Sequence, residues 1–347
     1  MQSFDFKLNK LLYDSGENWN SLSLFGSNSP SSFLKKKQNF SIRLTNKQIS
    51  FSGIIMLTYK KDFYLFKHLF IPSSNHNPSS SHDYYNLIQY NNIGEVGYKN
   101  NWLNIAISNG SEGWGSGNEI NLALDEYSKS YDYLKISSDY GNIRVKYLHG
   151  YLETIEDNLN RYITARGIEW VNKKSLILGF SETIIYSGNN RSLDFSYLNP
   201  ISSHVEIELN DRLNKIGSSG SNAVWQFHLD FLIREKLRFS LNYLIDEFVF
   251  DRDIEIGKEH GLGSSVRISY VTVDTENRFI SFIFKNTFIG TPTLRHSNGS
   301  NNFILNNHPL GWKGGSDSKE YSFGINYTNK KSTIFKMETG FTQSGEE

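Results

Sequence analysis

Side chains that could catalyse a reaction are present, but no motif arranges them as a known enzyme would. The nine histidines are scattered, and no two have the i, i+2 or i, i+4 spacing typical of a metal site. Carboxylates that could form a glycosidase acid and base are Glu182, Asp194, Asp246 and Asp251. Such a pair needs a separation of about 5 to 9 Å, which spacing along strands does not determine. We expect no catalytic activity, no metal and no cofactor, with a β-rich glycosidase as one alternative.

Aromatic and polar residues in glycine-rich connections form a second kind of candidate site, one that binds rather than reacts. Trp114 lies within residues 109–117, where glycines permit positive φ. One interpretation is a simple loop tip, and the other is an aromatic platform on which a sugar ring stacks. Binding residues concentrate in surface loops on a rigid scaffold. The candidates for glycan binding are Glu112, Trp114, Arg191, Asp194, Tyr197, Asn199, Trp312 and Asp317.

These candidates have two expected roles. Trp114, Tyr197 and Trp312 would be exposed stacking platforms, and the remaining residues would supply polar contacts. Arg191 suits an acidic sugar, because a guanidinium binds a carboxylate through two parallel hydrogen bonds.

The elements that hold these residues are predicted to be strands, because apolar and polar residues alternate with a period of two. Residues 225–231 alternate in this way, and the pattern resumes at 237–243 after a polar turn at 234–236. Two further hairpins of the same kind are predicted within 266–285 and 321–341. Before residue 130 strands are plausible, but their registers are unclear.

The composition restricts how such strands could meet a membrane. The chain has 20 Tyr, 24 Phe and 6 Trp with 21% charged residues, and 36 basic residues balance 36 acidic ones. No apolar stretch approaches the roughly 18 residues of a spanning helix, so a membrane location requires a closed barrel. The zero net charge offers no field for nucleic acid, which we do not expect as a partner. Cysteine is absent, so disulfides are excluded.

The lengths of the connections favour a barrel over a soluble sandwich. Short turns near residues 173, 235, 276 and 330 alternate with long polar segments at 187–221, 249–263 and 286–320. Bacterial outer-membrane barrels have short turns at the periplasmic end and long loops outside, whereas a sandwich does not require this alternation. We predict an all-β fold, a transmembrane antiparallel β-barrel located in the bacterial outer membrane.

Each face of the predicted strands has an expected environment. Residues predicted to face lipid are Trp225, Phe227, Leu229, Leu237, Phe239, Leu241, Ile280, Phe282 and Tyr321. Polar residues predicted to face the lumen are Arg166, Glu182, His228 and Arg267. We expect the connection 187–221 to fold into the lumen, with a short helical plug within 199–211.

The domain organisation is predicted to be simple. Residues 1–38 form an N-terminal segment that leads into the barrel, and residues 39–347 form a single barrel domain. The start of the sequence has no signal peptide, and residues 343–347 do not end a strand in an aromatic residue. We therefore expect the barrel to be truncated at both ends.

Several short segments in order across about residues 101–347 resemble the capsule assembly Wzi family, in particular its divergent branch. They are Trp-Gly-Ser-Gly at 114–117, the arginines at 161 and 166, 179–186, Tyr-Leu-Asn-Pro at 197–200, Ile-Asp-Glu-Phe at 245–248, Pro-Leu-Gly at 309–311 and Gly-Ser-Asp at 315–317. The resemblance implies an outer-membrane barrel, of about 18 strands in the enterobacterial members and about 16–18 strands in the full-length form of this protein. It also implies a lectin that anchors capsular polysaccharide and has no catalytic activity.

The expected function is therefore to bind and anchor capsular or extracellular polysaccharide at the cell surface. Outer-membrane lipid would be the other partner, and a monomer is favoured. A general porin or channel is the main alternative, because it shares all of the strand evidence. A lumen that conducts small solutes would distinguish it from a binding protein.

Overall fold

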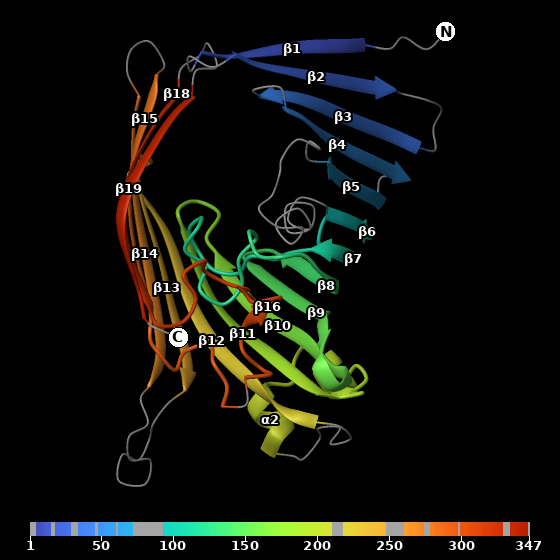
Figure 1. The fold of residues 1–347 in the computed structure, drawn as a ribbon, viewed down its shortest axis with the longest axis vertical. Coiled ribbons are helices and arrows are strands. Elements are labelled where there is room, and N and C mark those ends of the chain that lie inside the picture. The colour runs from blue at the N-terminus through green and yellow to red at the C-terminus, as the bar shows by residue number, and fades with distance from the viewer. Residues whose placement is uncertain are drawn as a thin grey trace. The chain divides into compact units, whose positions relative to one another are not determined.

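The computed structural model describes a chain built of antiparallel strands (Figure 1). It describes residues 5–14, 18–28, 34–45, 48–59, 62–71, 93–209, 218–247, 260–273, 278–297, 299–328 and 334–345. Asp251 and the turns predicted near residues 276 and 330 lie outside this part of the chain. Among the described residues, no helix is long and apolar enough to cross a membrane. The chain divides into two compact units, residues 1–110 with 129–136 and residues 111–128 with 137–347. The domain boundary at residue 38 stays a prediction.

The first unit is a run of antiparallel strands that pair in chain order. Its strands are β1 (Asp5–Asp14), β2 (Asn18–Asn28), β3 (Leu34–Thr45), β4 (Gln48–Tyr59), β5 (Phe63–Ile71), β6 (Ile93–Lys99), β7 (Leu103–Gly110) and the first part of β8 (Tyr131–Tyr140). A polar cluster forms around Glu95, which accepts hydrogen bonds from Tyr64 (2.5 Å) and Ser108 (2.7 Å). Lys135 completes it with an ion pair at 3.0 Å.

The second unit contains the longer strands, which also pair antiparallel. They are β9 (Ile143–Ile155), β10 (Leu159–Val171), β11 (Leu176–Asn189), β12 (Ser218–Ile233), β13 (Leu237–Glu247), β14 (Gly261–Val273), β15 (Phe279–Ile289), β18 (Ser318–Thr328) and β19 (Ile334–Ser344). Its short elements are η1 (Glu156–Asn158), η2 (Phe195–Leu198), α2 (His204–Leu209), β16 (Ile304–Leu305) and β17 (His308–Pro309). Helix α2 confirms the short helix predicted within 199–211.

The predicted hairpins are confirmed by the strand register. Phe227 pairs with Tyr243 and Leu229 with Leu241, across the turn at 234–236. Arg234 and Glu235 both adopt positive φ (49° and 59°), as the tight turn between two right-twisted strands requires. Short and long connections also alternate in this unit, at 172–175 and 190–217 for example.

The two faces of this sheet differ in chemistry, because consecutive strand residues point to opposite faces. One face, here called the apolar face, carries lateral rows of exposed side chains such as Ile168, Phe180 and Phe227. The other, here called the polar face, is buried although it is hydrophilic. Its buried residues include Gln226, His228, Asp230, Ser240, Asn242, Ser265, Lys285, Thr287, Glu320 and Ser322. An exposed apolar face and a buried polar face are typical of a barrel with lipid outside and a polar interior.

The residues predicted to face lipid all lie on the apolar face by strand register. Phe227, Phe282 and Tyr321 are exposed there. Trp225 lies on this face but is only partly exposed. Its indole NH donates a hydrogen bond to the buried Glu182 (3.0 Å).

Arginine in place of Phe284 on β15 is expected to impair folding into membranes, because Phe284 is exposed on the apolar face. Arginine on the lipid face at the midplane of a barrel costs about 2–4 kcal/mol. The matched control is Ser281→Arg on the same strand, at a position on the polar face. Heat-dependent gel migration would measure the folded fraction of each variant in lipid vesicles. Equal folding of the two variants would mean that the faces are assigned wrongly.

Candidate functional site

Residues 111–128, here called the insert, pack on the polar face of β12 to β14. The backbone NH of Ser116 donates to Asn242 Oδ1 (2.7 Å), and its hydroxyl donates to the carbonyl of Leu229 (2.6 Å). Asn242 Nδ2 donates in return to the carbonyls of Ser116 (2.8 Å) and Ile120 (3.2 Å). Ser265 adds a hydrogen bond from its hydroxyl to Ile120 (2.6 Å). Strand side chains therefore satisfy the backbone polar groups of the insert.

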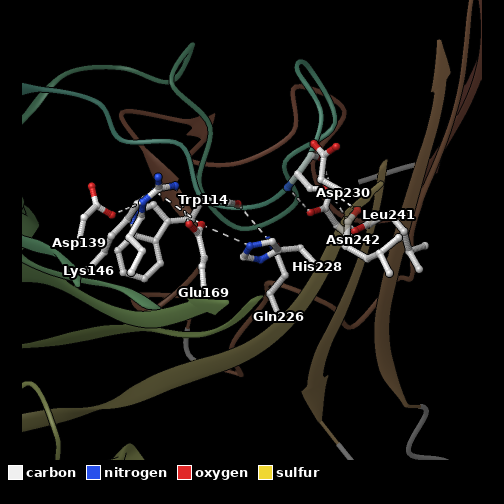
Figure 2. A network of polar contacts seen from close by, with 12 residues as sticks. Trp114, Asp139, Lys146, Glu169, Gln226, His228, Asp230, Leu241 and Asn242 are labelled. Atoms are coloured by element: carbon white, nitrogen blue, oxygen red, sulfur yellow. Dashed lines mark hydrogen bonds and ion pairs between the residues drawn. The ribbon is translucent and has the colours of Figure 1, made fainter. Parts of the chain in front are cut away.

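A neighbouring contact, made by Gln226, holds the turn of the insert (Figure 2). Gln226 Nε2 donates to the carbonyl of Trp114 (2.9 Å), and Gln226 Oε1 accepts from the backbone NH of Ala123 (3.4 Å). Gly115 lies between these contacts with φ of 135°, and a Cβ there would lie 2.6 Å from Asn242 Oδ1. The turn therefore needs glycine both for its backbone conformation and for its close approach to the strands.

Charged side chains surround the insert on the same face. Lys285 Nζ lies 2.8 Å from a carboxylate oxygen of Glu119 in the insert and 2.7 Å from one of Glu338 on β19. His228 Nε2 lies 3.3 Å from Glu169 Oε1. Figure 2 shows these two side chains pointing toward each other. The charge of Lys285 on this face is therefore balanced by two carboxylates.

A second connection, between β15 and β18, packs on the insert. The backbone NH of Asp125 donates to Leu310 (2.8 Å), and the NH of Trp312 donates to Leu122 (3.3 Å). A Cβ at Gly311 would lie 1.8 Å from the Leu122 carbonyl oxygen, so only glycine permits this approach. The insert and the 310–312 segment therefore form one packed layer on the polar face.

Arg161 on β10 anchors an earlier part of the same connection. Its guanidinium donates to the carbonyls of Ser300 (2.7 Å) and Asn302 (2.6 Å), and it also pairs with Glu153. One strand side chain thus fixes several backbone groups of a loop, which limits how far the loop moves away from the strands.

Asp125 in the insert is buried, and the pKa of its carboxyl group differs clearly from the usual value. Burial raises the pKa of its carboxyl to about 6, although the backbone NH of Tyr127 donates to it (2.9 Å) and favours the charged form. Ionisation of Asp125 above that pH therefore opposes burial of the insert.

Residues 191–207, here called the cover, pack on the opposite, apolar face. Tyr197 stacks on Tyr186 with ring centroids 4.7 Å apart, and Tyr186 stacks on Tyr162 at 5.1 Å. Ile207 joins this cluster, in which every member except Ala223 is buried. The hydroxyl of Tyr147 donates to the carbonyl of Tyr197 (2.8 Å). The prediction that the 187–221 connection folds into the lumen is wrong for residues 191–207, because the aromatic side chains that attract it project from the apolar face.

The prediction is also wrong for two of the four residues expected to face the lumen, Arg166 and Glu182. Arg166 pairs with Glu182, and Glu182 pairs with Trp225, in the register of the apolar face. Arg166 and Glu182 form a buried ion pair at 3.2 Å under the cover. Arg166 also donates to the carbonyl of Asn199 (3.1 Å), and Glu182 accepts from the backbone NH of His204 (3.2 Å).

The other two, His228 and Arg267, lie on the polar face as predicted. His228 is buried, and Arg267 is partly buried.

The predicted glycan-binding residues are not brought together into one exposed site. The prediction of exposure is wrong for the rings of Trp114 (5% exposed), Tyr197 (0%) and Trp312 (2%), because each is packed between a connection and the strands. Arg191 and Asp194 are also buried, as an ion pair at 2.8 Å.

The remaining candidates are more accessible. Asn199 is exposed in the cover, and Glu112 and Asp317 are partly exposed in the insert and next to β18. The hydroxyl of Thr291 donates a hydrogen bond to Asp317 Oδ1 (2.9 Å). Glycan binding by these residues stays a prediction.

Comparison with known proteins places the fold. No protein-family model and no curated protein matches the sequence. Among solved structures, the chain is similar to Escherichia coli Wzi, an outer-membrane carbohydrate-binding β-barrel involved in group 1 capsule assembly. The TM-score is 0.57 at 10% identity, with 99% of this chain and 69% of that chain covered. This is the fold of an outer-membrane β-barrel. It confirms the predicted fold class and the location in the bacterial outer membrane that accompanies it.

Two other solved structures also match, at lower similarity. Pseudomonas aeruginosa OccK11 (OpdR) has a TM-score of 0.48 at 10% identity, covering 99% of this chain and 88% of that chain. An anion-selective porin from Comamonas acidovorans has a TM-score of 0.43 at 10% identity, covering 94% and 91%. At these identities the likeness concerns the fold alone.

Proposed function

We propose that this outer-membrane barrel binds and anchors capsular or extracellular polysaccharide at the cell surface, without a chemical step. The observation that carries the proposal is the occupied polar face. A channel needs water along its polar wall, whereas the insert and the 310–312 segment cover much of this face with the chain's own backbone.

The connections that cover the polar face also present groups suited to sugars. Tyr127 in the insert is 64% exposed, and its backbone is fixed by the hydrogen bond to Asp125. Asn306 and Asn307 lie exposed at the turn between β16 and β17, both with positive φ. An exposed ring and amides on ordered backbone bind a flexible glycan with less loss of conformational entropy than mobile groups. Escherichia coli Wzi, which has a similar fold, binds carbohydrate.

A binding role without catalysis agrees with the state of the carboxylates. Glu182 is paired with Arg166, and Asp194 is paired with Arg191. Asp246 accepts a hydrogen bond from the backbone NH of Leu294 (2.5 Å). A glycosidase needs one carboxyl that gives up a proton and one free to attack or to activate water, and these groups are occupied in structural contacts.

Replacing Tyr127 by alanine is expected to weaken polysaccharide binding about tenfold, which corresponds to about 1.4 kcal/mol. The matched control is Tyr140→Ala, since Tyr140 is 80% exposed but lies at the short turn between β8 and β9. Binding of purified capsular polysaccharide from the source bacterium to the protein in detergent would be measured by biolayer interferometry. Retention of the same polymer on cells would be measured in parallel.

Two results would contradict the proposal. One is a parent protein that does not bind the polymer, and the other is a steady, large open-pore current from the parent in planar bilayers. The second result would favour the porin alternative. If the Tyr127 and Tyr140 variants lost binding equally, the assignment of Tyr127 to the binding surface would be wrong.

A further inference from the structure

We propose that the cover, residues 191–207, is immersed in the membrane and contacts lipid acyl chains on the side of the long connections. Its underside is fully buried against the strands, with Tyr197 and Ile207 both 0% exposed. Its other side presents Phe195 (81% exposed), Ile201 (88%) and Val205 (42%). Three apolar side chains on a short segment are therefore exposed in the part of the chain that the structure describes.

Strand length places the cover inside the apolar band of the membrane. A tilted strand needs about 9–11 residues to cross. Counted from the short turn at 172–175, the exposed stretch of β11 ends at Phe180 and that of β10 ends at Ile168. Both stretches are too short to cross, so the band must continue along residues that the cover hides. On β15, which lies further along the same sheet, side chains of the apolar face remain exposed or partly exposed from Ile280 to Phe288.

The buried ion pair supports the same position. Arg166 and Glu182 project from the apolar face about midway along a spanning length of β10 and β11. Without the cover, both charges would face hydrocarbon. The cover instead supplies the carbonyl of Asn199 and the backbone NH of His204 as partners. A segment that shields charges at this depth lies where lipid would otherwise lie.

Lipid is the occupant that the surroundings favour. The cover packs on the same face of the sheet from which Ile168, Phe180 and Phe227 project, and this face is the lipid-facing surface of the fold. This inference does not depend on polysaccharide binding.

Labelling at single cysteines tests the contact directly, because the chain contains no cysteine. Phe195→Cys and Ile201→Cys would be labelled with bimane in phosphatidylcholine vesicles and quenched by lipids brominated on the acyl chains. Phe284→Cys on the exposed apolar face is the positive control, and Tyr127→Cys in the insert is the aqueous control. Heat-dependent gel migration would confirm that each labelled protein is folded.

Quenching at positions 195 and 201 is expected to match that at 284 and to exceed that at 127. Quenching by aqueous iodide instead, as at 127, would overturn the proposal by placing the cover in water. Protection from both quenchers would also overturn it, since the patch would then be covered by protein. Disulfide cross-linking of two chains of the Phe195→Cys variant would identify that protein as a second copy.

Discussion

Replacement of Arg166 by methionine is expected to destabilise the folded protein by about 3–5 kcal/mol, because it leaves a buried charge without its partner. Glu182 is 3% exposed, and its contacts are Arg166, the Trp225 indole and the His204 backbone NH. The remaining neutral donors compensate a carboxylate less well than a guanidinium does. Urea unfolding in lipid vesicles, followed by tryptophan fluorescence, would measure the change.

Two further variants show whether the effect belongs to a buried pair. The double variant Arg166→Met with Glu182→Leu should recover much of the lost stability, because no unpaired charge remains. Arg238→Met breaks a more exposed ion pair with Asp230 at 2.5 Å, and it should cost about 1 kcal/mol or less. If the Arg166 and Arg238 variants lose equal stability, the interpretation of a buried, partner-dependent pair is wrong.

Replacement of Gly311 by alanine is expected to displace the layer on the polar face and to raise the conductance of the barrel. The added Cβ would lie 1.8 Å from the carbonyl oxygen of Leu122, a backbone atom that rotation of a side chain does not move away. Overpacking of this kind costs about 1–3 kcal/mol. The strand ladders remain intact, so the loss should fall on the insert rather than on the barrel. Single-channel recording and trypsin cleavage within residues 111–128 would measure the outcome.

Gly141→Ala is the matched control for this prediction. Gly141 has φ of 61°, and a Cβ there meets nothing within 4 Å, so only backbone strain is added. Its conductance and cleavage should equal those of the parent. If Gly311→Ala also leaves the insert protected and the current unchanged, the packed layer does not control access to the polar face.

The alternating pattern was sufficient to predict the three hairpins formed by β12 with β13, β14 with β15 and β18 with β19. Phe227 and Phe239 lie on the apolar face, and His228 lies on the polar face, as the period of two requires. Helix α2 also falls within the predicted segment. These features are local, because backbone geometry decides which side chains share a face of a strand.

Arg166 and Glu182 were placed on the wrong face because their polarity was given more weight than their position. Arg166 shares its face with Ile168 and Trp170, and Glu182 shares its face with Phe180. The period of two therefore contained the correct answer for both residues. Polarity alone predicted the wrong face, because a charged side chain on the lipid side avoids the free-energy cost of facing hydrocarbon only when another segment of the chain covers it.

The sequence by itself determined the strands of the three hairpins after residue 218, their faces and the alternation of short and long connections. Only the tertiary structure decided which connection packs on which face. The insert meets Asn242 and Gln226, more than 100 residues away along the chain, and the cover meets tyrosines that three different strands bring together. Burial of Trp114, Tyr197 and Trp312 follows from such contacts. No local pattern encodes them, because they depend on shape complementarity between segments whose separation in space is set only when the sheet has formed.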